Sequence, residues 1–397
     1  MSRHYKFHKQ SQRIHGLDAL RATMMLLGLV IHAAASYIPT PANADWPFRD
    51  PHSSWIMMNL GLFIHVFRMP TFYVVAGFFA ALLISKQGEN SFIRNRLQRI
   101  LIPFVIAWLI LYPLTSFGFS LAIQGELKLR EGLYAIGWDT PGVLLHLWFL
   151  YFLLIMYGLT LGFRNLSRAW PHVSAKVNRM MTRVLQSRWR LVWISLPMIG
   201  LMLPAGYLKT SMSLAPNWQI FAAYTYCFFI GWQMLHLKEQ FNRLFQPWPF
   251  YLLIGVTASA INQYALIQLR TGNVSLNLAL LSSVCAAFAC WGIVLGSFGL
   301  FLRFFSKDSK KVRYLVDASY WVYLIHLPII AFTAALLKPF AWPALLKFSM
   351  VLAVTSFASL ASYELFVRYT FIGRSLNGER NRPSRKQSSE VVAVKKV

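Results

Sequence analysis

The sequence contains few charged residues and very few acidic ones. Charged residues make up 13% of the 397 residues, and 13 Asp and Glu face 39 Lys and Arg, which gives a formal net charge of +26. Soluble domains carry about 25% charged residues, so this composition excludes an ordinary soluble protein. Apolar residues make up 56% of the chain, which is too many for a disordered protein. The composition therefore indicates an integral membrane protein.

Cysteines and several common catalytic motifs are also scarce or missing. The three cysteines, Cys227, Cys285 and Cys290, lie inside apolar runs and have neither a disulfide-framework pattern nor metal-ligand spacing. The sequence has no HExxH motif and no GxSxG elbow, so neither a metal site nor a serine acyl-enzyme is expected. It also has no internal repeat and no matched pair of broken helices, which argues against a transporter.

Long apolar runs occupy most of the chain. Most of them reach the roughly 20 residues that a helix needs to cross the hydrocarbon core. Ten membrane spans are predicted, at 17–38, 56–85, 100–123, 142–163, 191–207, 218–236, 249–268, 277–303, 315–337 and 342–366. The second is long and contains Pro70, so it is predicted as one helix kinked at that residue, with two separate segments as the alternative. The expected fold class is all-α, a polytopic membrane bundle of about ten transmembrane helices.

The basic residues fall mainly on one side of this arrangement. If the N-terminus is cytoplasmic, thirty Lys and Arg lie in the inner segments and six in the outer loops, as the positive-inside rule requires. Both termini are therefore predicted to be cytoplasmic, and the net charge reflects topology and anionic lipids rather than nucleic acid. The predicted parts are a cytoplasmic tail (1–16), a transmembrane domain (17–374) and a basic disordered cytoplasmic tail (375–397). The long inner loop 164–190 is predicted either as an amphipathic surface helix or as a basic loop on lipid headgroups.

Ionisable residues inside the spans are the first candidates for function, because each costs at least about 2.5–3.5 kcal/mol to insert. In the first span, Arg21 and His32 are 11 residues apart, close to three helical turns, so they share a face at depths about 16 Å apart. Asp18 precedes Arg21 by three residues and can pair with it. The alternative is structural, with an ion pair at the start of the helix and a histidine that bonds to a neighbouring helix.

The titratable residues of the spans form two groups by predicted depth. The group between the midplane and the outer side contains His32, His65, Arg68, His146 and His326. The group near the inner side contains Asp18, Arg21, Asp317 and Glu364, with Arg94, Arg96 and Arg99 just below it. The pattern predicts a cationic inner mouth and an outer chamber rich in histidine.

This layout suits acyl transfer from a thioester of coenzyme A to a hydroxyl. Arginine forks bind phosphate well, so the mouth is expected to hold a phosphorylated cytoplasmic donor. A desolvated histidine can act as general base on an alcohol, and Arg68 can stabilise a developing oxyanion. The depth difference between Arg21 and His32 is about the length of an extended pantetheine arm. The thioester is therefore predicted to be threaded from the mouth to the chamber.

Four motifs in the expected order resemble the signature of the acyltransferase family 3 membrane proteins. They are Arg21 and His32 with ten residues between them, Arg96-Leu97-Gln98-Arg99, His146-Leu147-Trp148-Phe149-Leu150, and the stretch from Ser319 through Tyr323 and His326 to Pro328. Longer passages, LDALRATMMLLGLVIHAA, IHVFRMPTFYVVAGFFA, RNRLQRILIPF, HLWFLYFLL and SYELFVRYTFIGRSLNG, are similar to one branch of that family. This branch is the glucans biosynthesis protein C group, succinyltransferases of osmoregulated periplasmic glucans.

The resemblance implies a multi-pass enzyme of the bacterial inner membrane. It implies a cytoplasmic acyl-CoA donor, with succinyl-CoA expected from the branch, no tightly bound cofactor, no metal, and a periplasmic glucan as the acceptor. Membrane lipids and a second copy in a homodimer are further expected partners; nucleic acid is not. The alternatives are an acetyltransferase acting on another cell-surface glycan, a transporter of an anionic lipid or acyl carrier, and a non-enzymatic membrane subunit.

The resemblance also assigns roles to residues. His32 matches the essential histidine of the family, Arg21 its arginine partner, and Arg96 and Arg99 the pair implicated in donor binding. The expected catalytic residues are His32, Arg21, Arg68, His326, Asp18 and Glu364. The expected donor-binding residues are Arg96, Arg99, Arg21, Ser319 and Tyr323, and the expected acceptor-binding residues are His65, His146 and Trp148. In the outer loops, Trp46, Trp55 and Trp138 are predicted either to stack on sugar rings or to belong to a membrane-interface belt.

Overall fold

The computed structural model describes residues 14–43, 46–130, 133, 144–203, 205–271 and 275–377. In these residues the chain is helical and forms no β-sheet, which confirms the predicted all-α class. The helices are α1 (His15–Ala35), α2 (Trp55–Arg96), α3 (Ile102–Gln124), α5 (Trp148–Ala169), α6 (Pro171–Gln186), α7 (Arg190–Met202), α8 (Trp218–Met234), α9 (Phe241–Leu244), α10 (Trp248–Arg270), α11 (Leu276–Phe304), α12 (Lys310–Leu337), α13 (Ala344–Ser362) and α14 (Phe371–Asn377). Short π-helical turns cover Leu97–Leu101 and Tyr363–Val367, and 3₁₀ turns cover Leu145–Leu147 and Leu235–Gln240.

Each predicted span corresponds to a helix, although the count of membrane-spanning helices differs. In the described part of the chain, eight helical stretches are long and apolar enough to cross a membrane. One of them, Trp55–Gln124, is 70 residues long and contains both α2 and α3, which were predicted as separate spans. The fifth predicted span is α7, which has 13 residues and is shorter than a full crossing requires. The polytopic bundle is thus confirmed.

The long helix α2 runs through Pro70 without a break. Its start is capped by Ser54, whose hydroxyl accepts a hydrogen bond from the backbone N–H of Ile56. The non-helical backbone lies instead at Gly88, with φ 79° and ψ 175°, a conformation that glycine adopts readily. The single helix is therefore confirmed and the two-segment alternative is wrong, but the backbone departs from the helix at Gly88 and not at Pro70.

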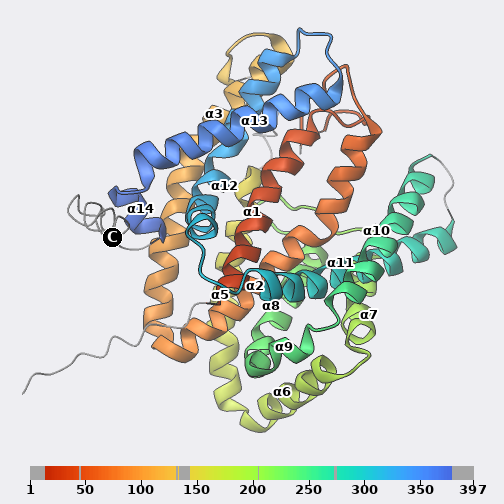
Figure 1. The fold of residues 1–397 in the computed structure, drawn as a ribbon, viewed down its shortest axis with the longest axis vertical. Coiled ribbons are helices and arrows are strands. Elements are labelled where there is room, and N and C mark those ends of the chain that lie inside the picture. The colour runs from red at the N-terminus through yellow and green to blue at the C-terminus, as the bar shows by residue number, and fades with distance from the viewer. Residues whose placement is uncertain are drawn as a thin grey trace, which may run out of the picture.

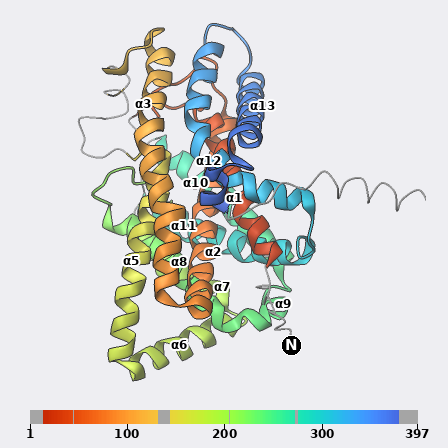
Figure 2. The same ribbon diagram turned by 90° about the vertical axis from the view of Figure 1, so that its left-hand side faces the viewer.

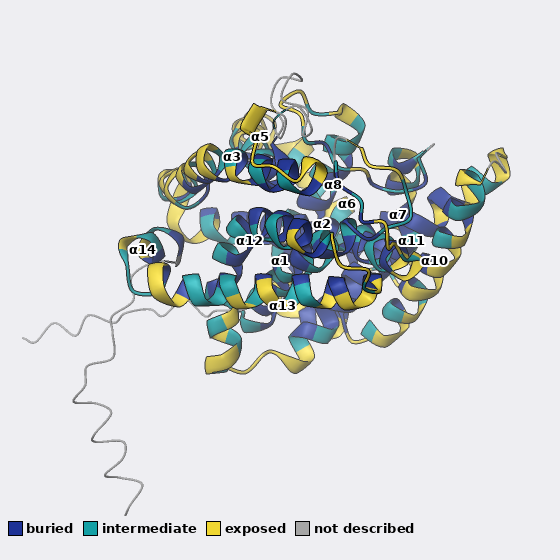
Figure 3. Cartoon of the chain, turned by 90° about the horizontal axis from the view of Figure 1, so that it is seen from above, coloured by how far each residue is buried: buried dark blue, intermediate teal, exposed yellow. Residues whose placement is uncertain are grey.

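Helix α1 lies at the centre of the bundle. It packs against α2, α11, α12 and α13, and Figures 1 and 2 show these helices around it. Seen from above in Figure 3, α1 and α2 are largely buried, whereas α3, α10 and α13 have exposed residues along their outer faces. Those exposed side chains include large apolar ones, such as Leu109, Leu253 and Phe357. An apolar outer face is what contact with lipid tails requires.

Glycines allow α2 and α8 to approach closely. A Cβ atom added at Gly77 would meet the carbonyl oxygen of Phe228, and one added at Gly231 would meet that of Val74. Small residues at facing positions let helix backbones touch, which is the main way that helices associate inside a membrane. This contact positions α2, the helix that carries His65 and Arg68.

One end of the bundle carries Arg94, Arg96 and Arg99, and we call it the basic end. Helix α6 lies across it, at the foot of the bundle in Figure 1. Leu185 of α6 is buried, Met181 and Val184 pack against the core, and Met180 is exposed. The amphipathic surface helix predicted for 164–190 is therefore confirmed.

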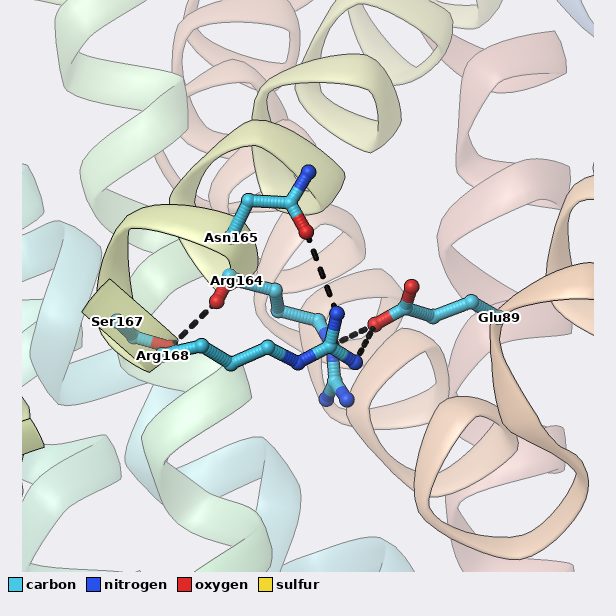
Figure 4. A network of polar contacts seen from close by, with 5 residues as sticks. All are labelled: Glu89, Arg164, Asn165, Ser167 and Arg168. Atoms are coloured by element: carbon cyan, nitrogen blue, oxygen red, sulfur yellow. Dashed lines mark hydrogen bonds and ion pairs between the residues drawn. The ribbon is translucent and has the colours of Figure 1, made fainter.

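An ionic network joins α2 to α5 at the basic end, and Figure 4 shows it from close by. Arg164 Nε and Arg168 Nη2 donate to the same carboxylate oxygen of Glu89, at 2.7 and 2.6 Å. Asn165 accepts a further hydrogen bond from Arg168 at 3.2 Å. The network holds the end of α2 beyond Gly88. The predicted tails, 1–16 and 375–397, lie mostly outside the described residues, and the side of the membrane that each terminus faces stays a prediction.

Candidate active site

Three histidines predicted from sequence meet near the middle of the bundle. The Nδ1 atom of His32 on α1 is 2.7 Å from Nε2 of His326 on α12, and the two rings stack with centroids 5.0 Å apart. The ring of His146, in the turn before α5, lies edge-on to both, 6.4 Å from His32 and 5.0 Å from His326. We call these three residues the histidine cluster. Their predicted agreement in depth is confirmed.

Backbone carbonyls of α12 orient two of these rings. His326 Nδ1 is 2.7 Å from the carbonyl oxygen of Tyr323, and His146 Nε2 is 2.9 Å from that of Leu324. Pro328 explains why the Leu324 carbonyl is open, because a proline inside a helix cannot donate to the carbonyl four residues earlier. Tyr323 completes the connection by donating its hydroxyl to the His146 carbonyl at 2.7 Å.

These contacts determine which nitrogen of each neutral ring carries hydrogen. A carbonyl oxygen only accepts, so His326 Nδ1 must donate to it, which leaves His326 Nε2 as an acceptor. His32 Nδ1 then donates to His326 Nε2, and the remaining nitrogen, His32 Nε2, keeps its lone pair. By the same logic His146 carries its hydrogen on Nε2, and its Nδ1 atom is buried with no hydrogen-bond partner. The backbone of the preceding Leu145 is held at φ 48°, an uncommon value for a residue with a Cβ atom.

Arg68 lies beside the histidine cluster. It acts electrostatically on His32, His65, His146 and His326. A Cβ atom built on Gly28 would be 2.5 Å from Arg68 Nη1, so the guanidinium lies against α1 one turn before His32. His65, one turn earlier on α2, turns to the loop after α7, with its Nε2 2.5 Å from the Leu208 carbonyl.

The loop between α1 and α2 covers His32 from the end opposite the basic one. Trp46 stacks on the His32 ring at 5.8 Å and donates its indole N–H to Ser36 at 3.0 Å. Arg49 holds the loop by donating to the carbonyl oxygens of Thr40, Trp46 and Phe48, each at 3.1 Å. Burial lowers the pKa of Arg49 to about 10, so the guanidinium is still charged at neutral pH.

A buried ion pair anchors the same loop to α13. Lys347 Nζ is 2.7 Å from Asp50 Oδ2, and both side chains are fully shielded from solvent. Asp50 is further fixed by its backbone N–H, which donates to the Ser36 carbonyl at 2.8 Å. Lys347 lies inside the predicted span 342–366, and its pairing with Asp50 was not predicted from the sequence.

Most of the second predicted group lines a cavity of about 280 Å³ that opens at the basic end. Its polar lining includes Asp18, Arg21, Arg96, Arg99, Asp317 and Ser319. Arg21 and Asp18 approach to 3.6 Å, which confirms that they can pair. The guanidinium of Arg96 lies over the rings of Phe92 and Tyr157, at 5.0 and 4.8 Å from their centroids, and stacking of this kind holds it in place. The predicted cationic mouth is present, and we call it the arginine-lined cavity.

A thin layer of side chains separates this cavity from the histidine cluster. Met25, Phe149 and Ser319 line the cavity at its deep end, away from the opening. The Ser319 hydroxyl lies 3.6 Å from the Met25 sulfur, and the Phe149 ring lies 5.9 Å from that of Tyr323. Since Tyr323 contacts both His146 and His326, the layer is in contact with the histidine cluster on its far side.

Some predicted site residues lie elsewhere. Glu364 is in the π-turn after α13 and binds Arg368 at 2.7 Å, outside the lining of the arginine-lined cavity. Trp148 is buried against Phe152 and Tyr224, with ring centroids 5.3 and 5.5 Å away, and does not line the arginine-lined cavity. Trp55 is 54% exposed on the outer surface, and Trp138 lies outside the described residues.

Comparison with known proteins decides the family. The sequence matches the acyltransferase domain family over residues 14–364. The chain belongs to acyltransferase family 3. It is a multi-pass membrane acyltransferase, and the motifs that predicted this form the histidine cluster and the arginine-lined cavity. In the described part of the chain, no group of three or more His, Cys, Asp or Glu side chains is arranged to hold a metal ion.

This acyltransferase is similar to proteins named glucans biosynthesis protein C. The relative from Escherichia coli O1:K1 / APEC is 26% identical over 393 residues, which cover 93% of this chain and 95% of the relative. Those from Escherichia coli (strain K12 / DH10B) and Shigella dysenteriae serotype 1 (strain Sd197) are each 26% identical over 388 residues, with the same coverage. No solved structure matches the chain.

Proposed function

We propose that this acyltransferase moves a succinyl group from cytoplasmic succinyl-CoA to hydroxyl groups of a periplasmic glucan, in the bacterial inner membrane. The observation that supports acyl transfer most directly is the 2.7 Å contact between His32 Nδ1 and His326 Nε2. The similarity to glucans biosynthesis protein C over 93% of the chain supports a glucan as the acceptor. The excess of basic residues at one end supports a cytoplasmic position for the arginine-lined cavity.

In this mechanism the nucleotide part of coenzyme A stays in the arginine-lined cavity. Arg96 and Arg99 bind its phosphates, because arginine donates paired hydrogen bonds to phosphate oxygens. The pantetheine arm extends along α1 towards the histidine cluster, and the flexible Met25 side chain moves away from Ser319 to let it pass. Arg21 and His32 lie on one helix about 16 Å apart, so the arm brings the thioester to His32 while the nucleotide remains at the basic end.

His32 acts as the general base. Its Nδ1 donates to His326, so its Nε2 accepts the proton of the glucan hydroxyl as the oxygen attacks the thioester carbon. The carbon–sulfur bond then breaks, the succinyl group stays on the glucan oxygen as an ester, and the proton on His32 passes to the departing thiolate. His326 and the Tyr323 carbonyl keep His32 in the required tautomer, in the way that a third group orients the base of a catalytic triad.

Mass spectrometry of periplasmic glucans tests the proposal. Glucans from cells that express the protein are expected to carry succinyl esters, and glucans from cells without it are not. Acetyl esters in place of succinyl would identify the alternative donor on the same framework. Identical glucans in both strains, at confirmed membrane abundance of the protein, would contradict the proposed function.

A further inference from the structure

Arg68 is a buried cation whose partners in the structure are weak. Its Nη2 atom donates to the sulfur of Met69 at 3.1 Å, and a thioether is a poor acceptor. Its Nη1 atom is buried with no hydrogen-bond partner. Among the ion pairs of the described residues, none includes Arg68. The guanidinium therefore has free donors directed into the interior of the protein.

The surroundings of Arg68 provide no negative charge either. The titratable side chains in electrostatic contact with Arg68 are three tyrosines and four histidines. They are Tyr73, Tyr224, Tyr323, His32, His65, His146 and His326. No carboxylate of the described residues belongs to this group. A buried charge with no counter-ion is costly, and inside a membrane such residues mark substrate sites. An anion that arrives with the substrate is the natural partner of Arg68.

Gly28 gives this anion access to α1. A Cβ atom there would lie 2.5 Å from Arg68 Nη1 and 3.4 Å from Cζ, so glycine is what lets the guanidinium lie against the helix. Gly28 precedes His32 by four residues, which places them on one face about 6 Å apart along the axis. A four-carbon diacid is long enough to bridge that separation.

We propose that Arg68 binds the free carboxylate of the succinyl group and so selects a dicarboxylic acyl donor over a neutral one. The inference rests on the proposed function, since it assigns acyl selectivity to the same site. The carboxylate would form a charge-assisted, two-pronged hydrogen bond with the guanidinium. A neutral acyl group of equal length would bury Arg68 with no anion, and sites built to bond a polar group reject analogues that lack it.

The oxyanion role predicted from sequence makes a different demand on Arg68. An oxyanion forms from every acyl donor, so losing a guanidinium that stabilises it would slow transfer from all donors alike. Carboxylate binding concerns the succinyl group alone. The comparison that separates the two uses succinyl-CoA and butyryl-CoA, which have acyl chains of equal length and differ in the terminal carboxylate.

The experiment measures kcat/KM for both donors with purified protein in liposomes and a glucan oligosaccharide, for the unmodified chain, Arg68→Met and Arg68→Lys. The unmodified protein is expected to prefer succinyl-CoA by about 10²-fold or more, as for other buried charge pairs that lose one partner. Arg68→Met is expected to lose that preference by losing activity with succinyl-CoA alone. Arg68→Lys retains the charge and is expected to keep part of the preference.

Two results would overturn the inference. If the unmodified protein uses butyryl-CoA as well as succinyl-CoA, no carboxylate site exists. If Arg68→Met slows both donors equally, Arg68 serves the oxyanion or the fold, and coenzyme A binding by the variant separates these two. Both results leave the proposed acyl transfer intact. Failure of the unmodified protein to consume either donor with the glucan would instead contradict the proposed function itself.

Discussion

At the scale of single residues, the proposed chemistry depends on one nitrogen atom of His32. The carbonyl of Tyr323 sets the tautomer of His326, and His326 sets that of His32. The chain of contacts leaves a lone pair on His32 Nε2, the atom that we propose as the base. Because backbone geometry fixes the tautomers of His32 and His326, we expect activity to depend on the imidazole ring itself and not on the net charge of the site.

Removing the imidazole should therefore abolish transfer. His32→Ala is expected to lower acyl transfer by about 10²–10⁴-fold, the contribution typical of a general base, while the protein still inserts and binds coenzyme A. Transfer to glucan and binding of coenzyme A are measured on the same liposomes. If the variant keeps more than about a tenth of the activity at equal abundance, where a base contributes at least about 10², His32 is not the base.

Donor binding should depend on the two arginines of the cavity. Arg96→Gln and Arg99→Gln are each expected to weaken coenzyme A binding by about 10–100-fold, the usual effect of losing a hydrogen bond to a charged group. Arg94→Gln is the matched control, because Arg94 is exposed at the same end and does not line the cavity. Calorimetric titration with coenzyme A gives the affinities. If all three variants bind coenzyme A as tightly as the unmodified protein, Arg96 and Arg99 do not bind the donor and serve only to anchor the protein in the membrane.

At the scale of elements, the face of α1 between Met25 and His32 is the proposed path of the pantetheine arm. Gly28→Leu is expected to fill that path and displace Arg68, because even a Cβ atom meets Nη1 at 2.5 Å. The variant should bind coenzyme A but not transfer the acyl group. Gly158→Leu is the control, since nothing lies within 4 Å of the Cβ position of Gly158 on α5. Normal transfer by folded Gly28→Leu protein would rule out this path.

The loop that carries Trp46 depends on the Asp50–Lys347 pair. Asp50→Asn leaves Lys347 buried with no counter-charge, which is expected to destabilise the protein by about 3–5 kcal/mol. The double variant Asp50→Asn/Lys347→Met removes both charges and should recover most of that loss. Thermal unfolding in detergent compares the three proteins. If the double variant is no more stable than Asp50→Asn, the pair is not what anchors the loop.

At the scale of the whole molecule, the sequence predicts the helices well because each span is long and apolar. It also predicts the depth at which His32, His146 and His326 meet, since depth follows from position along a helix. It does not predict that the Leu324 carbonyl orients His146, which requires the register of two helices. Pro70 lies inside α2 as predicted, because neighbouring helices allow a proline inside a membrane helix. The non-helical backbone at Gly88 lies beyond the predicted span 56–85 and was not predicted.

The residues that sequence reasoning placed less well depend on long-range or irregular geometry. Glu364 was expected among the catalytic residues, but a π-turn at Tyr363–Val367 changes the helical register and its carboxylate binds Arg368. Asp50 and Lys347 are 297 residues apart, so their pairing leaves no local signal. Trp46 reaches His32 from a loop that this pair and Arg49 hold in place.

The most direct test of the account asks from which side each substrate is used. Purified protein is inserted into liposomes in one orientation, with labelled succinyl-CoA supplied at the basic end and a glucan oligosaccharide on the opposite side. Transfer through the bundle predicts that label appears in the glucan across the membrane, and that it disappears when donor and acceptor exchange sides. Labelling that requires both substrates on the same side would contradict transfer through the bundle from the arginine-lined cavity to His32.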